Sequence, residues 1–230
     1  MQLIAFDIET ARIDELAATL PEPEVALGNL VDPVKIQAKK DIARANQLDK
    51  MALDPRFSRV ICASVATRHP SGAAEQFTES VVDFEGGETS LLDWLWGILS
   101  RNRDACICTF NGASFDVPFI TWRSLILDVP FARIECNKYR VTSPSCGHLD
   151  VYRLLQEWEP CGDSNPLAIK RNQAFYAKQL LGRECPYGEP DKSKLGELIA
   201  NGQADVVKQI NEWDAMTTLL LAEKVLQLAS

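Results

Sequence analysis

Histidine is scarce in this chain of 230 residues, which has only His69 and His148. That scarcity excludes zinc sites of the H-E-x-x-H type and most other metal sites built from several histidines. The patterns G-x-x-x-x-G-K-[ST] and G-x-G-x-x-G are both missing, so the common phosphate-binding loops are excluded as well. No run of about 18 apolar residues occurs, which argues against a membrane-spanning helix and a membrane partner.

The seven cysteines are odd in number and include no C-x-x-C pair. This pattern favours free, partly buried thiols in a reducing compartment over a disulfide framework. The N-terminal residues carry no basic leader and reach Asp7 early, so we expect no secretion signal. A cytoplasmic protein is the simplest interpretation.

Acidic residues outnumber basic ones by 32 to 24, and the formal net charge is −8. A protein that coats nucleic acid would be repelled by phosphate at long range, so this class is disfavoured. A nuclease whose acids hold metal ions remains compatible with the charge, because the cations offset the acids locally. The 46% share of hydrophobic residues is enough for a substantial buried core.

Alternation of apolar and polar residues predicts a strand over residues 2–9. Successive side chains of a strand point to opposite faces, so Ile4 and Phe6 would lie on a core face while Asp7 and Glu9 share the other. The two carboxylates would lie about 7 Å apart along the strand. An acidic pair at a strand end can also be no more than the start of a loop.

The order of the remaining elements, strands first and then helices, predicts one α/β domain over residues 1–230. Further strands are expected at 60–66, 74–82 and 105–110. Helices are expected after a cap at Ser90 and near 114–127, 149–157, 166–181, 192–200 and 203–228.

A polar excursion at about 21–55 contains a predicted helix that begins at Asp32-Pro33. One side of this helix carries four basic residues, Lys35, Lys39, Lys40 and Arg44. Such a set is either a solvated face or a basic flank for a nucleic-acid backbone.

Two further acids occupy informative positions. Asp116 follows the strand at 105–110 and an Asn-Gly turn, where functional residues often lie on a rigid scaffold, although it could equally be a helix N-cap. Asp214 interrupts an apolar face of the last helix, whose other members are Val207, Ile210, Thr217, Leu221, Val225 and Leu228. A buried carboxylate costs several kcal/mol unless it is paired, protonated or bound to a cation.

Asp7, Glu9, Asp116 and Asp214 together would form an oxygen-rich set that suits Mg²⁺ or Mn²⁺ better than zinc or copper. A pair of such ions about 4 Å apart can activate a water and stabilise the entering and leaving oxygens of a phosphodiester. The acids therefore indicate metal-dependent phosphodiester hydrolysis. A salt bridge at Asp214 and a structural calcium site are the alternatives.

Three segments resemble the motifs of the DEDD 3′–5′ exonucleases, the ribonuclease-H-like group that includes proofreading domains of DNA polymerases. They are Phe6-Asp7-Ile8-Glu9-Thr10, Asn111-Gly112-Ala113-Ser114-Phe115-Asp116 and Glu212-Trp213-Asp214-Ala215-Met216-Thr217-Thr218. The resemblance spans residue 4 to about 226. The chain is similar to stand-alone enzymes that resemble the exonuclease domain of family B polymerases, many of them encoded by phages.

This resemblance implies a ribonuclease-H-like domain, with a mixed five-stranded sheet flanked by helices. It implies that Asp7, Glu9, Asp116 and Asp214 hold two Mg²⁺ or Mn²⁺ ions, and that water attack releases nucleoside monophosphates from a 3′ end. Single-stranded DNA is the expected substrate, a replication or recombination protein a possible partner, and the host cytoplasm the location if the source is a phage.

Four residues are expected to contact the nucleic acid: Thr10, Asn111, Phe115 and His148. Phe115 is otherwise a core residue, and His148 is otherwise a cap or loop residue. Asp150 is either a fifth acid at the site or the cap of the helix near 149–157, and we favour the cap.

This sequence departs from the family pattern at one place. The family has a Tyr four residues before the last Asp, or a His five residues before it, to orient or deprotonate the attacking water. Ile210 and Gln209 stand at these positions. Gln209 could orient a water without taking its proton and is the expected replacement, with Asn211 a weaker candidate. The alternative to an enzyme is an inactive relative that binds a 3′ end or serves as a partner subunit.

Overall fold

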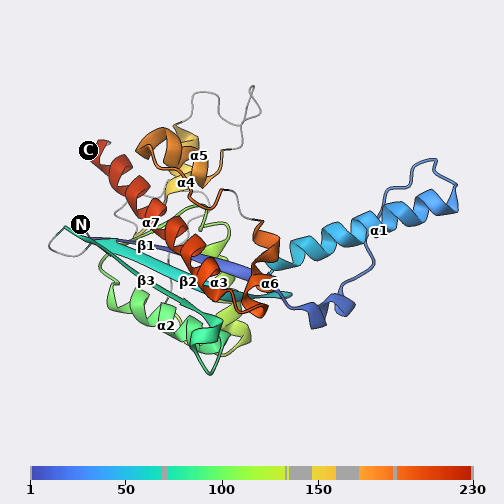
Figure 1. Cartoon of the computed structure of the whole chain (residues 1–230), viewed down its shortest axis with the longest axis horizontal. Helices are drawn as coiled ribbons and strands as arrows, with labels where there is room; N and C mark the ends of the chain where they lie inside the picture. The colour runs from blue at the N-terminus through green and yellow to red at the C-terminus, as the bar shows by residue number, and fades with distance from the viewer. Residues whose placement is uncertain are drawn as a thin grey trace.

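The computed structural model describes residues 2–68, 72–132, 134, 147–158, 171–188 and 191–228. Its centre is a sheet in the order β3-β2-β1-β4-β5 (Figure 1). The strands are β1 (Leu3–Arg12), β2 (Ser58–Arg68), β3 (Ala74–Ser80), β4 (Cys106–Thr109) and β5 (His148–Asp150). The pairs β1–β2 and β2–β3 are antiparallel, whereas β1–β4 and β4–β5 are parallel. The mixed five-stranded sheet expected from the sequence is therefore confirmed.

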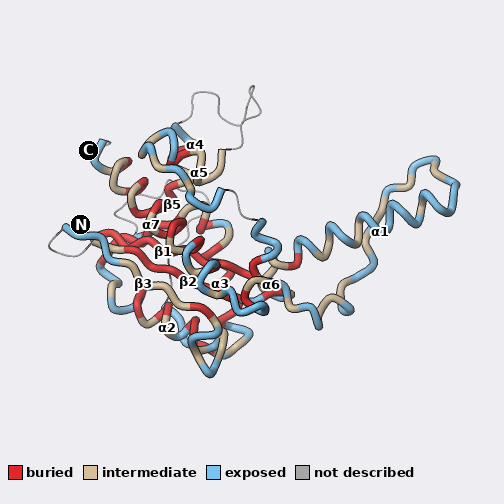
Figure 2. Tube along the Cα trace, in the orientation of Figure 1, coloured by how far each residue is buried: buried red, intermediate tan, exposed pale blue. Residues whose placement is uncertain are grey.

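Helices cover both faces of this sheet. They are α2 (Glu88–Arg101), α3 (Asp116–Ile126), α4 (Val151–Glu157), α5 (Gln173–Tyr176), α6 (Leu195–Ala200) and α7 (Ala204–Leu228). Phe6 belongs to the core cluster that includes side chains of α2 and α3, and Ala5 to the cluster that includes side chains of α4 and α7. Both faces of β1 are therefore buried (Figure 2), and its carboxylates lie on the face toward α7.

The long helix α7 buries the face that the sequence predicts. Val207, Thr217 and Leu221 are fully buried, while Leu228, at the end of the stripe, is 74% exposed. Asp214 lies within this face and is 7% exposed. The buried acid expected from the periodicity of α7 is therefore present.

The excursion before β2 contains helix α1 (Pro33–Lys50), which Asp32 caps by accepting a hydrogen bond from the Val34 N–H. Figure 1 shows α1 extending away from the sheet. Short 3-10 turns flank the larger elements at Asp14–Thr19, Met51–Leu53, Val81–Asp83 and Lys192–Lys194, and a π-helical turn at Ala177–Leu181 continues α5.

Three local expectations are corrected. Helix α2 is capped by Gly87, which places Ser90 inside the helix. The helix expected near 149–157 begins only at Val151, because His148–Asp150 pairs with β4 as strand β5. Of the helix expected at 166–181, the described part holds α5 and the π-helical turn, whereas 166–170 and most of the loop expected at 139–147 lie outside the described residues.

Four of the seven cysteines lie in the described part, and all four are free thiols: Cys62, Cys106, Cys108 and Cys185. No helix among the described residues is long and apolar enough to cross a membrane. The cytoplasmic location stays a prediction.

Candidate active site

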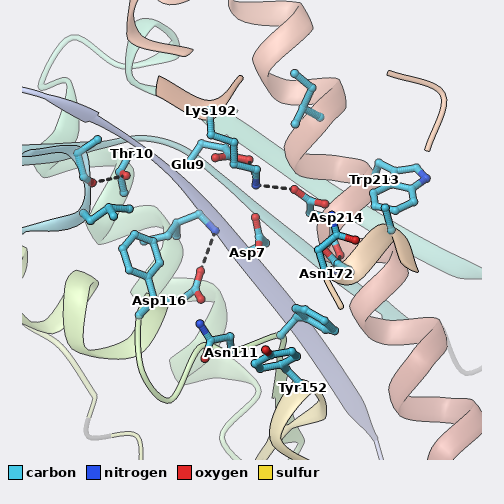
Figure 3. Close-up of a pocket in the computed structure, with 18 of the residues that line it drawn as sticks. Asp7, Glu9, Thr10, Asn111, Asp116, Tyr152, Asn172, Lys192, Trp213 and Asp214 are labelled. Atoms are coloured by element: carbon cyan, nitrogen blue, oxygen red, sulfur yellow. Dashed lines mark hydrogen bonds and ion pairs between the residues drawn. The ribbon is translucent and has the colours of Figure 1, made fainter. Parts of the chain in front are cut away.

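Three segments far apart in the chain bring four carboxylates to one end of the central strands. Asp7 and Glu9 come from β1, Asp116 is the first residue of α3, and Asp214 lies on α7. Carboxylate oxygens of Asp7, Glu9 and Asp214 all lie within 4.8 Å of one another. In Figure 3, Asp7 points into the space between Asp116 on one side and Asp214 on the other.

The β1 strand is irregular where it carries these acids. Its register against β2 shifts between Glu9 and Thr10, an irregularity of the β-bulge kind that is common beside active sites. Just beyond the shift, the Thr10 hydroxyl donates a 2.7 Å hydrogen bond to the Ala52 carbonyl. This bond ties the end of the strand to the turn that follows α1.

The turn that carries Asp116 is held by backbone geometry and by a buried acid. Asn111 adopts a φ of 65°, and a Cβ at Gly112 would collide with the Thr109 side chain. The carboxylate of Asp150 accepts the N–H groups of Asn111 and Ala113 at 2.9 and 3.0 Å. It also caps α4, which agrees with the favoured interpretation of Asp150. Asp116 itself accepts the Ile8 N–H at 3.3 Å.

Lys192 lies inside the acidic cluster. Its ammonium is 2.7 Å from a Glu9 oxygen and 2.8 Å from an Asp214 oxygen, while about half of its side chain (53%) stays exposed. The ammonium is therefore paired with two carboxylates and is not a freely solvated charge. The role of Lys192 at the site could not be predicted from the local sequence, because the residue belongs to a short 3-10 turn that only the tertiary fold places beside β1 and α7.

The cluster has more negative charge than one ammonium can offset. Burial, followed by the nearby Asp214 and Asp116, raises the pKa of Asp7 well above its usual value. Burial also raises the pKa of Glu9, against the opposing effect of Lys192, and raises the pKa of Asp116 to about 7. Without a further cation, these acids are therefore driven toward the protonated form.

That charge imbalance fits a divalent cation. The donor set is made of carboxylate oxygens with no histidine or cysteine, as Mg²⁺ and Mn²⁺ prefer. Asn211 is fully buried beside the cluster and donates to an Asp7 oxygen at 2.7 Å. Its own carbonyl oxygen, Oδ1, has no hydrogen-bond partner among the described residues. The site therefore holds an excess of negative charge that a divalent cation would offset.

The acids lie at the wall of a cavity of about 680 Å³. Four aromatic side chains line it: Phe110, Phe115, Tyr152 and Trp213. Thr10 and Asn111 line it too, as do Arg171 and Asn172 from the start of α5. Of these residues, the sequence pointed to Thr10, Asn111 and Phe115, whereas Tyr152, Arg171 and Asn172 carry no local signal of such a role.

Two expected site residues lie elsewhere. Gln209 is exposed on the outside of α7, where the Tyr187 hydroxyl contacts its carbonyl oxygen at 3.4 Å, and it does not line the cavity. The side chain that does line the cavity at this level is Ile210. A water-orienting role for Gln209 therefore has no geometric support.

His148 is 1% exposed and lies inside β5, where its Nε2 is 2.9 Å from the Thr109 hydroxyl. Burial lowers its pKa to about 4, so the ring is neutral at pH 7. The structure does not bring it to the cavity, because His148–Asp150 form a buried strand. A nucleic-acid contact from His148 therefore has no geometric support either.

Comparison with known proteins finds no family model that matches the chain. The chain is 28% identical over 205 residues to "DNA polymerase 1" of Aeropyrum pernix, a match that covers 86% of this chain and 19% of that protein. Its structure is similar to that of the family B DNA polymerase from the hyperthermophilic archaeon Pyrobaculum calidifontis, with a TM-score of 0.61 and 17% identity. That match covers 98% of this chain and 24% of the polymerase chain.

The chain thus spans about a fifth to a quarter of the length of these relatives. The structural match shows that it shares the fold of a segment of a family B DNA polymerase, and the sequence match supports the resemblance to those enzymes. A stand-alone, phage-type origin stays a prediction.

Proposed function

We propose that the chain is a metal-dependent 3′–5′ exonuclease that removes nucleoside monophosphates from the ends of single-stranded DNA. The convergence of Asp7, Glu9, Asp116 and Asp214 at one cavity supports this proposal. A structural ion-pair network needs about as many basic groups as acidic ones, whereas here four buried acids surround one lysine. A site that binds divalent cations does require such an excess of acids.

Two bound Mg²⁺ or Mn²⁺ ions would supply an activated water and stabilise the oxygen that leaves the phosphodiester. Glu9 and Asp214, together with Asp7, are suited to hold one ion. Asp7 and Asp116 are suited to hold the other, because Asp7 lies between the two halves of the cluster (Figure 3).

The cavity walls are suited to the terminal nucleotide. The cavity volume of about 680 Å³ lies within the range of small-ligand pockets. Phe115 and Tyr152 line it as aromatic faces on which any base can stack, without a sequence preference. This arrangement favours a frayed or single-stranded end, because a base must leave its duplex to reach such walls.

An inactive relative that only binds a 3′ end is the second candidate. Ile210 favours it, because an isoleucine lines the cavity where the family has a Tyr, and it cannot orient or deprotonate a water. For the enzyme, the bound metal ions would have to activate the attacking water without help from a Tyr or His. Such an enzyme would turn over slowly.

The test is an exonuclease assay on a 5′-labelled single strand with Mn²⁺. We expect products shortened stepwise from the 3′ end, and no products from Asp7→Asn. A matched control is Asp104→Asn, which removes an exposed acid just before β4, at the opposite end of the parallel strands. An RNA strand and a DNA duplex of the same sequence decide the substrate class.

Binding of Mn²⁺ and of the strand without any shortening would contradict the exonuclease and support the inactive relative. Release of the 5′ label as a mononucleotide, without a ladder of labelled intermediates, would contradict the proposed polarity. A polymerase that acts together with this chain remains a proposal, which follows from the relatives being whole polymerases.

A further inference from the structure

Helix α1 forms an arm that extends from the domain and contributes no buried residue to the core. None of its 18 residues is buried, and in Figure 2 it is exposed or half-buried along its whole length. The large apolar side chains Val34 and Ile42 are 77% and 63% exposed. Most helices in proteins are stabilised by packing an apolar face against a core. Because no residue of α1 is buried, such packing does not account for this helix.

The arm is nevertheless built in a defined direction. At its base Met51 is buried and Thr10 bonds to Ala52, so the C-terminal end is attached to β1. Arg44 donates to the carbonyls of Ala17 and Pro21, at 2.9 and 3.2 Å. These hydrogen bonds hold the segment around residues 17–21, which leads from β1 to α1, against the side of the helix.

The charge of the arm is opposite to that of the chain. It carries five basic residues and two acids, while the whole chain has a net charge of −8. Lys35, Lys39 and Lys40 are exposed, and none of them forms an ion pair within the described part of the chain. Lys39 donates only a long, 3.5 Å hydrogen bond to the Ala26 carbonyl. A local positive charge without an internal counter-ion suits a polyanion.

The base of the arm is also part of the candidate active site. Asp49, at the last turn of α1, and Ala52 and Leu53, just after it, line the cavity. From this rim the 18 residues of the helix extend for about 27 Å at 1.5 Å per residue. At about 3.4 Å per nucleotide, that length corresponds to about eight nucleotides of a stacked strand.

We propose that the α1 arm binds the phosphates of the strand whose 3′ end lies in the cavity. This inference rests on the proposed function, since it takes the strand end in the cavity as its starting point. Lys35, Lys39 and Lys40 then contact nucleotides several positions from the scissile bond. The arm binds through charge and not through base edges, so it adds affinity without sequence preference.

A protein partner on the arm is the competing idea. Its support is Val34 and Ile42 on the helix, with Val31 just before it and Leu53 just after it; these are single apolar side chains spaced along the arm. The excess positive charge is the stronger feature, and it favours nucleic acid.

The experiment measures binding of fluorescent single strands at several salt concentrations, in EDTA so that no cleavage occurs. The test variant is Lys35→Gln/Lys39→Gln/Lys40→Gln. The control variant removes the same charge at Arg101, Arg103 and Lys224, which lie outside the arm and the cavity lining. Each lost phosphate contact lowers the slope of log affinity against log salt by about 0.7 for a single strand.

We expect the slope of the arm variant to be shallower by about 2, and its affinity at about 0.1 M salt to be weaker by about 10- to 100-fold. Strands shorter than about eight nucleotides should show a smaller effect. The control variant should keep the slope of the wild type. Equal slopes for wild type, arm variant and control would overturn the proposal.

Two further readouts separate this proposal from the proposed function and from a protein partner. Hydrolysis of a dinucleotide with Mn²⁺ should be the same in wild type and arm variant. Absence of all hydrolysis would refute the exonuclease, while the salt slopes would still decide the arm. An unchanged slope in the lysine variant, with loss of self-association in Val34→Ser/Ile42→Ser, would overturn the proposal in favour of a protein contact.

Discussion

Replacement of Asp116 by Asn should stabilise the metal-free protein at neutral and alkaline pH. The Asp116 side chain is buried, and burial raises its pKa from 3.8 to about 7. One pKa unit corresponds to about 1.36 kcal/mol, so the ionised carboxylate disfavours the folded state by up to about 4 kcal/mol above pH 7. Asparagine removes this cost, and its carbonyl can still accept the Ile8 N–H.

The sign follows from proton linkage. Because the folded pKa lies above the unfolded one, the folded protein holds this proton more tightly than the unfolded chain between about pH 4 and 7. The contribution of Asp116 to stability is therefore fully present below about pH 4 and is lost as the pH rises through 7. The gain of Asp116→Asn should be largest near pH 8 and should shrink toward zero near pH 4.

Urea unfolding in EDTA at pH 4.5, 6 and 8 measures this gain. Asp83→Asn is a control of opposite sign, because hydrogen bonds from Lys208 and Ser80 outweigh burial and lower the pKa of Asp83. Its substitution should destabilise the protein at pH 8. With Mn²⁺ added, wild type should gain more stability than Asp116→Asn, since the variant has lost a ligand. A loss of stability in Asp116→Asn at pH 8 in EDTA, or a difference independent of pH, would refute the reasoning.

Three further substitutions test the site and its supporting turn. Lys192→Met removes the cation between two buried carboxylates, so the free energy of unfolding in EDTA at pH 8, measured with urea, should fall by about 2 kcal/mol. Calorimetry should show tighter Mn²⁺ binding, because the lysine no longer competes with the metal. Weaker Mn²⁺ binding would mean that the lysine does not compete. Gly112→Ala should lower the free energy of unfolding by about 1–3 kcal/mol, because the new Cβ collides with the Thr109 side chain. The control Gly97→Ala, inside α2, should raise it by about 0.5–1 kcal/mol. Equal effects of the two substitutions would contradict the steric argument. Ile210→Tyr should raise kcat on a single strand by at least about tenfold at unchanged Mn²⁺ affinity, and an unchanged kcat would show that this position does not limit turnover.

The periodic parts of the sequence predicted the fold well. The alternation in β1 places Phe6 and Asp7 on opposite faces, and the stripe of α7 places Asp214 on the buried side. Both patterns depend on one element and its own geometry, which a single sequence contains. The short strand β5 was missed because its three residues are too few to show a period.

Predictions that depended on tertiary placement were less successful. Gln209 follows a family position but lies on the exposed side of α7, and His148 is covered by the sheet. Lys192 reaches the acids from a 3-10 turn, and Tyr152 reaches the cavity from α4. Neither side chain has a local pattern that marks it, because its position depends on how connecting segments return to the end of the sheet.

Calorimetric titration of the metal-free protein with Mn²⁺ tests the central claim most directly. We expect the wild type to bind two ions per chain, Asp104→Asn to bind as the wild type does, and Asp7→Asn to lose both, because Asp7 lies between the two halves of the cluster. Equal Mn²⁺ binding by wild type and Asp7→Asn would contradict the claim that these acids form a metal site.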